Sequence, residues 1–392
     1  MKRLFSLFNR LKYKNSEMIS SSIFFNFENM FFLKLFKKQK MKIGITADCH
    51  LNSKYPERRE VLKKIFEELK NHEINTLFIL GDLFDKAQQN YSEFDALLRE
   101  FSDIEVYLIP GNHDYNVSQA YFVSSNLKVI TEPKLISFAN VNFLFVPYKG
   151  GKTLDEVVAE QLYKKEEKVI LLSHGDYITT SHYRPNPYEE DKIYMPLSSL
   201  TIEKFKLEKV FLGHIHKPSE YGKVLYPGSP CPIDSSETGK RSFLIFDTEN
   251  FECERVQIDT PYIYFKSKIL VYPVDNGLEL LEKNLENLIS SWDLPSEDIK
   301  KVKLYLSFTG YFSDKSELKQ KVEEFFRNTE IEIKELNLDD VLVPTHDESF
   351  EDRKKIFEMI NKIPEKIDEI NLSENEIKEE ILKIIFGKKQ SN

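Results

Sequence analysis

The sequence has few cysteines, no long apolar run and no excess of positive charge. Its 392 residues include three widely spaced cysteines, Cys49, Cys231 and Cys253. An odd, scattered set excludes a disulfide framework and a zinc ribbon, and it fits a reducing compartment, so we expect a cytoplasmic protein. The formal net charge of −9 argues against a protein that coats nucleic acid by bulk electrostatics, although a local basic groove is compatible with it.

Long apolar segments, internal repeats and low-complexity tracts are also missing from the sequence. No apolar stretch approaches the roughly 20 residues that span a bilayer, so no stable membrane association is expected. The composition, with 41% hydrophobic and 30% charged residues, is that of an ordinary globular protein. The length suffices for two or three domains with a large buried core.

The first forty residues differ in character from the rest. Residues 1–40 are rich in Phe and carry nine Lys or Arg against two Glu. They form an amphipathic segment at a membrane surface or an extension from a mis-chosen start codon. We prefer the second explanation, because Met41 opens a strand that reads as a natural beginning of the fold.

From residue 41 to residue 261 the pattern alternates between strands and helices. Apolar residues at helical spacing alternate with short β-like runs, which predicts an α/β domain with sheets covered by helices. The expected strands are Lys42–Ala47, Thr76–Leu80, Glu105–Ile109, Asn142–Val146, Lys168–Ser173, Lys209–Leu212 and Ser242–Asp247. The expected helices are Glu57–His72, Ser92–Phe101 and Thr153–Lys165.

Two further units follow the first domain. Residues 262–340 repeat the order strand, helix, strand, helix, strand and read as a smaller α/β domain. Residues 341–392 form a tail with two short amphipathic helices, Arg353–Ile363 and a second one that begins at a capping box of Ser373 and Glu376. The apolar faces of these helices need a partner.

Polar clusters follow five of the expected strands, at the edge where α/β sheets place their sites. The clusters are Asp48-Cys49-His50, Gly81-Asp82-Leu83-Phe84-Asp85, Asn112-His113-Asp114, His174-Gly175 and Gly213-His214-Ile215-His216. Taken singly, the Asn-His-Asp cluster is equally well explained as ordinary turn chemistry. Five clusters together are hard to explain by packing, and they indicate a dinuclear metal site.

The chemistry of these side chains narrows the choice of metal. Imidazole, carboxylate and amide groups without thiolates suit manganese, iron(II), zinc or magnesium, with manganese a good match and copper a poor one. Alternation along an extended segment would place Asp48 and His50 on one side and Cys49 on the other. We therefore expect Cys49 to pack in the core and not to bind metal.

These motifs resemble the calcineurin-like metallophosphoesterase superfamily, whose pattern is D-x-H, G-D-x-x-D, G-N-H-D/E, H and G-H-x-H. Within it, Gly213-His214-Ile215-His216-Lys217-Pro218 and Tyr226-Pro227-Gly228-Ser229-Pro230 resemble the SbcD, or meiotic recombination eleven-type, nucleases. One departure is Lys86-Ala87-Gln88-Gln89-Asn90, where that family often has Arg-Pro-Ser-like residues. This difference concerns the DNA-facing loop and leaves the metal motifs intact.

The resemblance implies a four-layer αββα sandwich with a smaller α/β capping domain that binds DNA and a helical tail. It implies two divalent ions, which we expect to be Mn²⁺, the first held by Asp48, His50, Asp82 and His216. The second would be held by Asp82, Asn112, His174 and His214, with Asp82 as the bridge. His113 is then left to stabilise the phosphate or protonate the leaving oxygen, with Asp114 as its orienting partner and Asp85 as a support for the ligands.

The implied function is a metal-dependent DNA nuclease that acts in repair and recombination. Such a nuclease would degrade double-stranded DNA from its ends and cut single strands internally. Its partners would be DNA and an SbcC-type SMC-like ATPase, in a heterotetramer that contains a homodimer of this chain. A metallophosphoesterase for smaller phosphodiesters or phosphomonoesters is the alternative that the metal motifs leave open. A non-catalytic scaffold is disfavoured by the complete ligand set.

Overall fold

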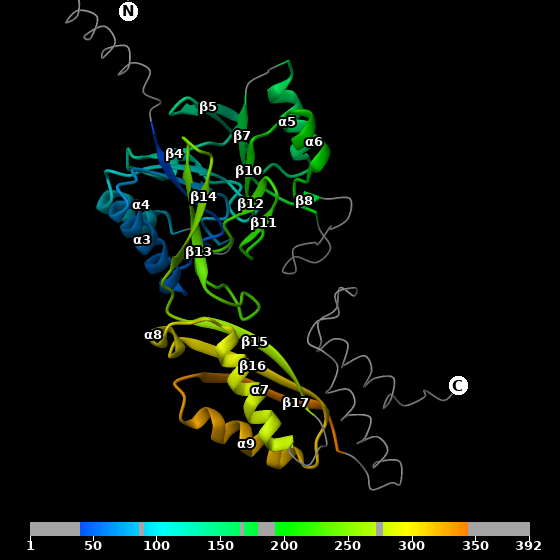
Figure 1. Ribbon diagram of the computed structural model, residues 1–392. Helices are drawn as coiled ribbons and strands as arrows, with labels where there is room; N and C mark the ends of the chain where they lie inside the picture. The colour runs from blue at the N-terminus through cyan, green and yellow to red at the C-terminus, as the bar shows by residue number, and fades with distance from the viewer. Residues whose placement is uncertain (1–39, 86–89, 165–167, 179–192, 272–276, 344–392) are drawn as a thin grey trace, which may run out of the picture.

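The computed structural model of the chain describes residues 40–85, 90–164, 168–178, 193–271 and 277–343. Two six-stranded sheets with helices on their outer faces are followed by a smaller three-stranded unit (Figure 1). The predictions for the head before Lys40 and for the two tail helices lie outside the described residues. Within the described ranges, no helix combines the length and apolar character that crossing a membrane requires.

The first sheet has the strand order β14-β13-β1-β2-β3-β4. Strands β1 to β4 pair in parallel, and β13 and β14 extend the sheet in antiparallel fashion beyond β1. The strands are β1 (Lys42–Thr46), β2 (Thr76–Leu80), β3 (Glu105–Ile109), β4 (Leu127–Val129), β13 (Arg241–Asp247) and β14 (Cys253–Ile258). Helices α3 (Pro56–Asn71) and α4 (Tyr91–Glu100) pack on its outer face, and a short 3-10 helix, η1 (Gln119–Tyr121), precedes β4.

The second sheet has the strand order β11-β12-β10-β7-β6-β5. Its strands are β5 (Lys134–Phe138), β6 (Val141–Phe145), β7 (Val169–His174), β10 (Lys209–Gly213), β11 (Ser219–Tyr221) and β12 (Val224–Tyr226). Helices α5 (Leu154–Leu162) and α6 (Ser199–Lys204) cover its outer face. Helix α5 begins at a capping box, in which the Thr153 hydroxyl and the Glu156 carboxylate each accept a backbone N–H of the first turn. A two-stranded pair, β8 (Tyr177–Ile178) and β9 (Leu197–Ser198), lies beside helices α5 and α6.

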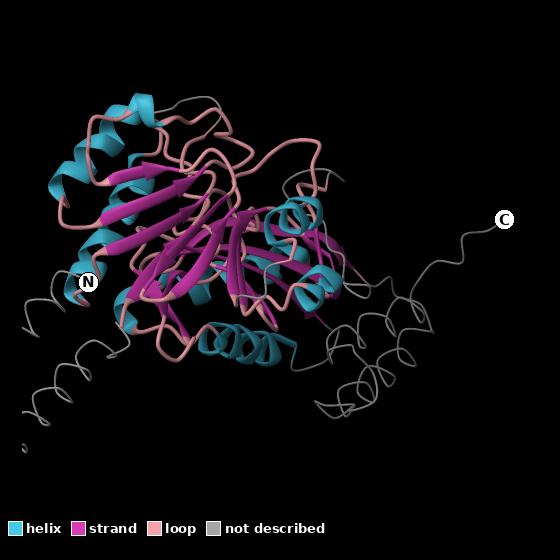
Figure 2. Cartoon of the chain, turned by 90° about the horizontal axis from the view of Figure 1, so that it is seen from above, coloured by secondary structure: helices cyan, strands magenta, loops and turns pink. Residues whose placement is uncertain are grey.

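The two sheets face each other between the helices, as the view from above shows (Figure 2). Alternation along each strand produces this layering, because neighbouring side chains point to opposite faces. In β2, Phe78 and Leu80 enter the core between the sheets, whereas Leu77 and Ile79 pack against α3 and α4. The predicted αββα sandwich is therefore confirmed.

The smaller unit is a parallel sheet of β15, β16 and β17 with its own hydrophobic core. Its elements are β15 (Ile263–Val271), α7 (Gly277–Ser291), α8 (Ser296–Ile299), β16 (Val302–Tyr311), α9 (Lys315–Arg327) and β17 (Glu332–Leu342). Parallel strands need long crossovers, and α7 and α9 supply them. The separate core supports the predicted division of the chain near residue 261, although that boundary stays a prediction.

Polar contacts join the smaller unit to the sandwich. The Gly239 N–H donates to the Tyr264 carbonyl at 2.9 Å, and the Tyr262 hydroxyl donates to Glu57 at 3.1 Å. Lys301 pairs with Asp298 at 2.7 Å within the unit and with Asp259 at the end of the sandwich.

The sequence pattern missed several short elements. Strands β4, β11 and β12 have three residues each, too few for a periodic signal. Helices α6 and α8, with six and four residues, were missed for the same reason.

Candidate metal centre

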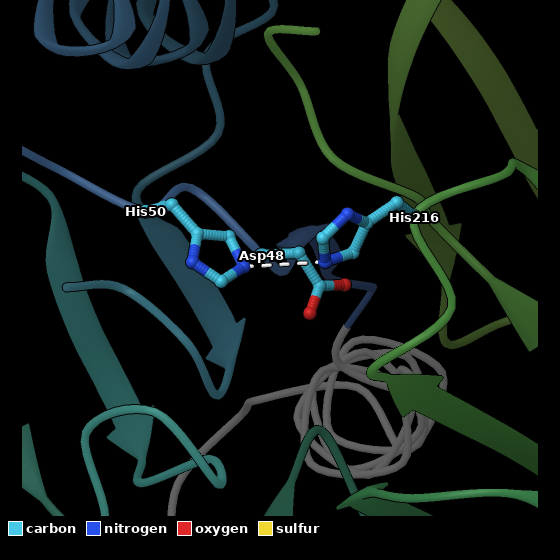
Figure 3. Close-up of side chains that lie close together, drawn as sticks. All are labelled: Asp48, His50 and His216. Atoms are coloured by element: carbon cyan, nitrogen blue, oxygen red, sulfur yellow. Dashed lines mark hydrogen bonds between the residues drawn. The ribbon is translucent and has the colours of Figure 1, made fainter. Parts of the chain in front are cut away.

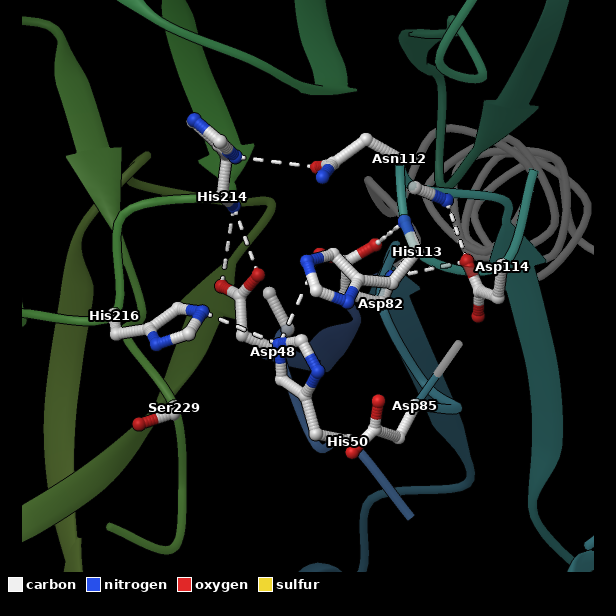
Figure 4. A network of polar contacts seen from close by, with 12 residues as sticks. Asp48, His50, Asp82, Asp85, Asn112, His113, Asp114, His214, His216 and Ser229 are labelled. Atoms are coloured by element: carbon white, nitrogen blue, oxygen red, sulfur yellow. Dashed lines mark hydrogen bonds and ion pairs between the residues drawn. The ribbon is translucent and has the colours of Figure 1, made fainter. Parts of the chain in front are cut away.

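All seven predicted ligands come together at the C-terminal ends of β1, β2, β3, β7 and β10, where the two sheets meet. Figure 4 labels all of them except His174. Each has a relative exposure of 8% or less. They are Asp48, His50, Asp82, Asn112, His174, His214 and His216. So many buried polar side chains are costly unless hydrogen bonds, ion pairs or a metal compensate their lost hydration.

Two glycines of the motifs allow this close approach. Gly81 has φ of +84°, and a Cβ there would lie 2.4 Å from Nδ1 of His174. A Cβ on Gly111 would lie 2.2 Å from Oδ1 of Asp82. A side chain at either position would displace a predicted ligand, which explains why the G-D and G-N-H motifs begin with glycine.

Four predicted ligands themselves have left-handed backbone conformations. The φ angles are 53° at Asp48, 44° at His50, 50° at Asp82 and 95° at His214. Non-glycine residues avoid this region, and strain of this kind concentrates at functional sites. The extended segment expected at Asp48-Cys49-His50 was therefore wrong, because β1 ends at Thr46 and both Asp48 and His50 have positive φ. The expected burial of Cys49 in the core is nevertheless confirmed.

The first ligand cluster contains Asp48, His50 and His216 (Figure 3). The Nε2 atoms of His50 and His216 lie 3.2 Å apart. One donor atom from each of the three residues falls within 4.8 Å of the others. Two imidazole nitrogens aimed at one point suit a shared cation, which both lone pairs can bind.

The second cluster is centred on the Asn112 side chain. Its Oδ1 lies 2.7 Å from Nε2 of His174 and 3.2 Å from Nδ1 of His214. This cluster comes from β3 and its loop on one sheet and from β7 and β10 on the other.

Asp82 lies between the two clusters. Its Oδ2 is 3.8 Å from Nε2 of His50 and 3.4 Å from Nε2 of His174. Its Oδ1 accepts the backbone N–H of His113 at 2.8 Å, which fixes the orientation of the carboxylate. One oxygen is thus placed within reach of both clusters, the position that a bridging ligand occupies.

The hydrogen bonds of two histidines set their tautomers for metal binding. Nδ1 of His174 lies 2.9 Å from the Leu80 carbonyl, and Nδ1 of His216 lies 2.8 Å from Glu237. Each Nδ1 therefore carries the proton and leaves Nε2 as the atom that faces the cluster. The donor set fits divalent ions such as Mn²⁺, Fe²⁺ or Zn²⁺.

The charges of the site also favour a cation. Burial raises the pKa of Asp48 to about 6. Burial opposes protonation of His174, but the neighbouring Asp82 and Asp48 carboxylates raise its pKa to about 10. Burial lowers the pKa of His50 and His214. A divalent ion would favour the ionised carboxylates and the neutral imidazoles that its ligation requires.

His113 and Asp114 differ in their surroundings. The His113 ring is half-buried at the site, with its centroid 4.8 Å from that of His50, and one of its nitrogens lies within 4.8 Å of ligand atoms of His50 and Asp82. The fully buried Asp114 carboxylate accepts backbone N–H groups of Gly111, Asp82, Leu83 and Phe84 at 2.7–3.2 Å. It therefore ties the two ligand loops together, a task that the sequence did not indicate. Its role as the orienting partner of His113 stays a prediction.

Sequence reasoning missed several buried residues behind the ligands. Glu237 contacts His216, and Arg241 pairs with Glu237 at 3.3 Å while it donates to Ser229. Asp176 lies 3.8 Å from Nε2 of His214. Glu237 stands in a polar turn without a motif, so one sequence carries no signal for it. Ser229 is the exception, because it belongs to the Tyr-Pro-Gly-Ser-Pro segment singled out above.

Other predicted residues lie near the centre or outside the described residues. Asp85 accepts from Asn52 at 3.2 Å and faces Arg58, which donates to the His50 carbonyl at 3.0 Å. These contacts support the predicted supporting role of Asp85. The loop residues Lys86 to Gln89 lie outside the described part of the chain.

Comparison with known proteins finds one matching family, several relatives and several solved structures. Residues 41–218 match the calcineurin-like phosphoesterase family. A protein of Vesicomyosocius okutanii subsp. Calyptogena okutanii (strain HA) named "probable cyclic nucleotide phosphodiesterase" is 26% identical over 200 residues, 47% of this chain and 83% of that protein. A UDP-2,3-diacylglucosamine hydrolase of Hamiltonella defensa subsp. Acyrthosiphon pisum (strain 5AT) is 33% identical over 130 residues, 30% of this chain. The match spans about half, 49%, of that hydrolase.

A solved structure from Thermus thermophilus is 15% identical, with a TM-score of 0.37 over 55% of this chain and 98% of the other. The family match covers the five motif clusters, and the fold places them at one centre with the donor set of a metal site. Residues 41–218 are thus similar to the calcineurin-like phosphoesterase family over the segment that carries all five motif clusters.

Proposed function

We propose that the chain hydrolyses phosphodiesters with two divalent metal ions, and that these ions are Mn²⁺. The observation that carries this proposal is the position of Asp82, whose Oδ2 lies within 3.8 Å of His50 and 3.4 Å of His174. We assign Asp48, His50, Asp82 and His216 to one ion. Asp82, Asn112, His174 and His214 are assigned to the other.

Two bound ions would neutralise the phosphate and activate a water molecule for in-line attack. The protein fixes the geometry of this chemistry through its buried ligands and their hydrogen bonds. His113 lies beside the ligands on a loop that Asp114 fixes, and its half-buried imidazole is placed to donate a proton to the leaving oxygen.

The names of the relatives favour a substrate smaller than DNA. One relative is named a cyclic nucleotide phosphodiesterase and the other a UDP-2,3-diacylglucosamine hydrolase. Neither carries the name of an SbcD nuclease. A small phosphodiester is therefore the substrate that the comparisons support best.

DNA is the second candidate, and the smaller unit favours it. Helices α7 and α9 pack on one face of its sheet, and the strand residues that alternate away from this core include Tyr264, Lys266, Lys268, Lys303 and Tyr305. Lysines and tyrosines on one sheet face suit phosphates and unstacked bases, and a phosphate would compete there with Asp340, 3.7 Å from Lys268, and Glu332, 3.9 Å from Lys303. The net charge of −9 is compatible with such a local surface.

Incubation of the full chain with Mn²⁺ tests both substrates. Native protein should hydrolyse bis(p-nitrophenyl) phosphate, and the His113→Ala variant should not. Linear duplex DNA and a single-stranded circle are offered in parallel. Degradation of DNA that depends on His113 establishes the nuclease, whereas turnover of the small ester alone refutes it. No turnover of either substrate, with metal bound, refutes the phosphodiesterase.

The nuclease proposal includes an SbcC-type ATPase that binds the tail, in a heterotetramer that contains a homodimer of this chain. The tail lies outside the described residues, so the support is its amphipathic sequence pattern. Removal of residues 350–392 should abolish co-purification of the ATPase and spare Mn²⁺-dependent hydrolysis. Unchanged co-purification would contradict this assignment.

A further inference from the structure

A cavity of about 760 Å³ adjoins the second ligand cluster. Asn112 and Tyr115, both on the loop after β3, form part of its wall, and the remaining wall comes from the turn before β5, the segment after β6, helix α5 and the residues before β9. Its volume is within the range of sites for small molecules. We call it the Asn112 cavity.

Three tyrosines line the Asn112 cavity. The ring of Tyr194 lies 4.8 Å from that of His214 and 6.1 Å from that of Tyr148, measured between centroids. Tyr148 is tied to the loop after β3, because its N–H donates to the Pro110 carbonyl at 3.0 Å. Tyr115 stands on the same loop and is 69% exposed. Two of the three rings are thus half-buried beside the metal ligands, and the third stands at the mouth.

Charged groups complete the lining. Lys149 is exposed at the mouth, and Lys152 lies 3.4 Å from Glu160. The lining mixes the apolar side chains of Pro133, Val146, Pro147, Val157 and Met195 with phenol rings, lysines and carboxylates, whereas acyl chains need continuous apolar walls. Any nucleobase can stack on an aromatic ring, and lysines attract the phosphates of a nucleotide. The lining therefore matches a nucleoside phosphate better than a lipid.

We propose that the Asn112 cavity is a subsite that stacks the base of a nucleoside phosphate whose phosphate lies at the metal centre. The inference rests on the proposed phosphodiesterase function. It adds the chemical identity of one substituent of the scissile phosphate, a nucleoside. Tyr148 and Tyr115 are specificity residues, and Lys149 attracts a further phosphate or the sugar-phosphate backbone. The same chemistry is presented by a free nucleotide and by the end of a nucleic acid strand.

Two chromogenic esters with the same leaving group test the subsite in the full chain with Mn²⁺. One is the p-nitrophenyl ester of thymidine 5′-monophosphate, and the other is methyl p-nitrophenyl phosphate, which has no base. We define the ratio as kcat/KM for the thymidine ester divided by kcat/KM for the methyl ester. In Tyr115→Ala and Tyr148→Leu this ratio should fall by about 5–150-fold, which corresponds to about 1–3 kcal/mol per stacked base. The matched control is Tyr163→Ala, a tyrosine that is 71% exposed and outside the lining. It should keep the native ratio.

Calorimetric titration of the Mn²⁺-loaded protein with thymidine 5′-monophosphate gives a second readout. Binding should weaken in both cavity variants and remain native in the control. A native ratio together with native binding in Tyr115→Ala and Tyr148→Leu would overturn the proposal. Competition with a thymidine decamer separates the sources: tighter binding than the monophosphate, lost in Lys149→Ala, identifies a strand, and equal binding identifies a free nucleotide.

The proposed function fails separately from this inference. If native protein that contains Mn²⁺ hydrolyses neither ester, the phosphodiesterase proposal is refuted. The titration then decides on the cavity, because it needs no turnover.

Discussion

Replacement of Glu237 by glutamine should weaken metal binding through His216 without any change to a predicted ligand. Glu237 is 3% exposed, and its Oε1 lies 2.8 Å from Nδ1 of His216. The other carboxylate oxygen accepts from Ser229 and pairs with Arg241 at 3.3 Å. The carboxylate therefore orients an imidazole and neutralises a buried guanidinium at the same time.

The two roles of Glu237 have separable magnitudes. Loss of a carboxylate behind a metal-binding histidine lowers metal affinity about 10–100-fold. We expect about tenfold, or about 1.4 kcal/mol, because the glutamine oxygen still accepts from His216. Loss of one partner of a buried ion pair costs about 3–5 kcal/mol. The lower value, about 3 kcal/mol, applies because Arg241 keeps its bonds to the oxygens of Ser229 and the His216 carbonyl.

Calorimetric titration with Mn²⁺ and thermal unfolding in chelator measure these two effects. The metal-free Glu237→Gln protein should unfold about 6–12 °C below native, at the ~2–4 °C per kcal/mol typical of a domain of this size. The double variant Glu237→Gln/Arg241→Met should regain stability, because no unpaired buried charge is left, while its Mn²⁺ affinity stays low. Glu254→Gln, an exposed change on β14, is the matched control. Native Mn²⁺ affinity in folded Glu237→Gln would refute the positioning role.

Three further predictions follow from other contacts. His113→Ala should keep its metal and lose about 100-fold or more in kcat, whereas Asp82→Ala should lose metal; elemental analysis that shows the reverse contradicts the assigned roles. Burial opposes ionisation of Asp95, but two backbone N–H groups before β4, at 3.0 and 2.9 Å, hold its pKa below the ordinary value. The stabilising effect of ionised Asp95 is therefore complete above the unfolded pKa of about 3.9 and is lost as the pH falls through the folded pKa. In Asp95→Asn the Tm should therefore fall less steeply on acidification than in native protein. Curves of Tm against pH that run parallel for the two proteins would contradict this. Lys301→Met removes the ion pairs with Asp259 and Asp298 and should cost about 1 kcal/mol or less, because Asp298 keeps its pair with Lys240; it should also reduce the salt dependence of unfolding, and unchanged salt dependence would count against these pairs.

Much of the secondary structure could be predicted because its signals are local. The expected strand Thr76–Leu80 coincides with β2, and the expected helix Glu57–His72 differs from α3 by one residue at each end. Their apolar residues repeat at the period of one buried face. Strands of three residues, such as β4 and β12, escaped because pairing with neighbouring strands defines them.

The outcome at Asp48-Cys49-His50 shows where local reasoning reaches its limit. The expectation that Cys49 packs in the core was confirmed, but the extended conformation behind it was wrong, because Asp48 and His50 have positive φ. Tertiary contacts hold this strained turn: the Asp48 and His50 N–H groups donate to carbonyls of Gly81 and Asp82. A pattern of residue types cannot report strain that another loop stabilises.

The sequence by itself determined which side chains carry the chemistry. Its polar clusters follow strand ends, and the carboxyl ends of strands in α/β sheets lie at one edge, so the sequence alone predicts that the clusters come together. Only the tertiary structure decided how they divide: it places one oxygen of Asp82 between the clusters and Glu237 behind His216. It also opens the tyrosine-lined cavity beside Asn112. The physical reason is that these relations join segments far apart in the chain, so they are set by the packing of the two sheets against each other.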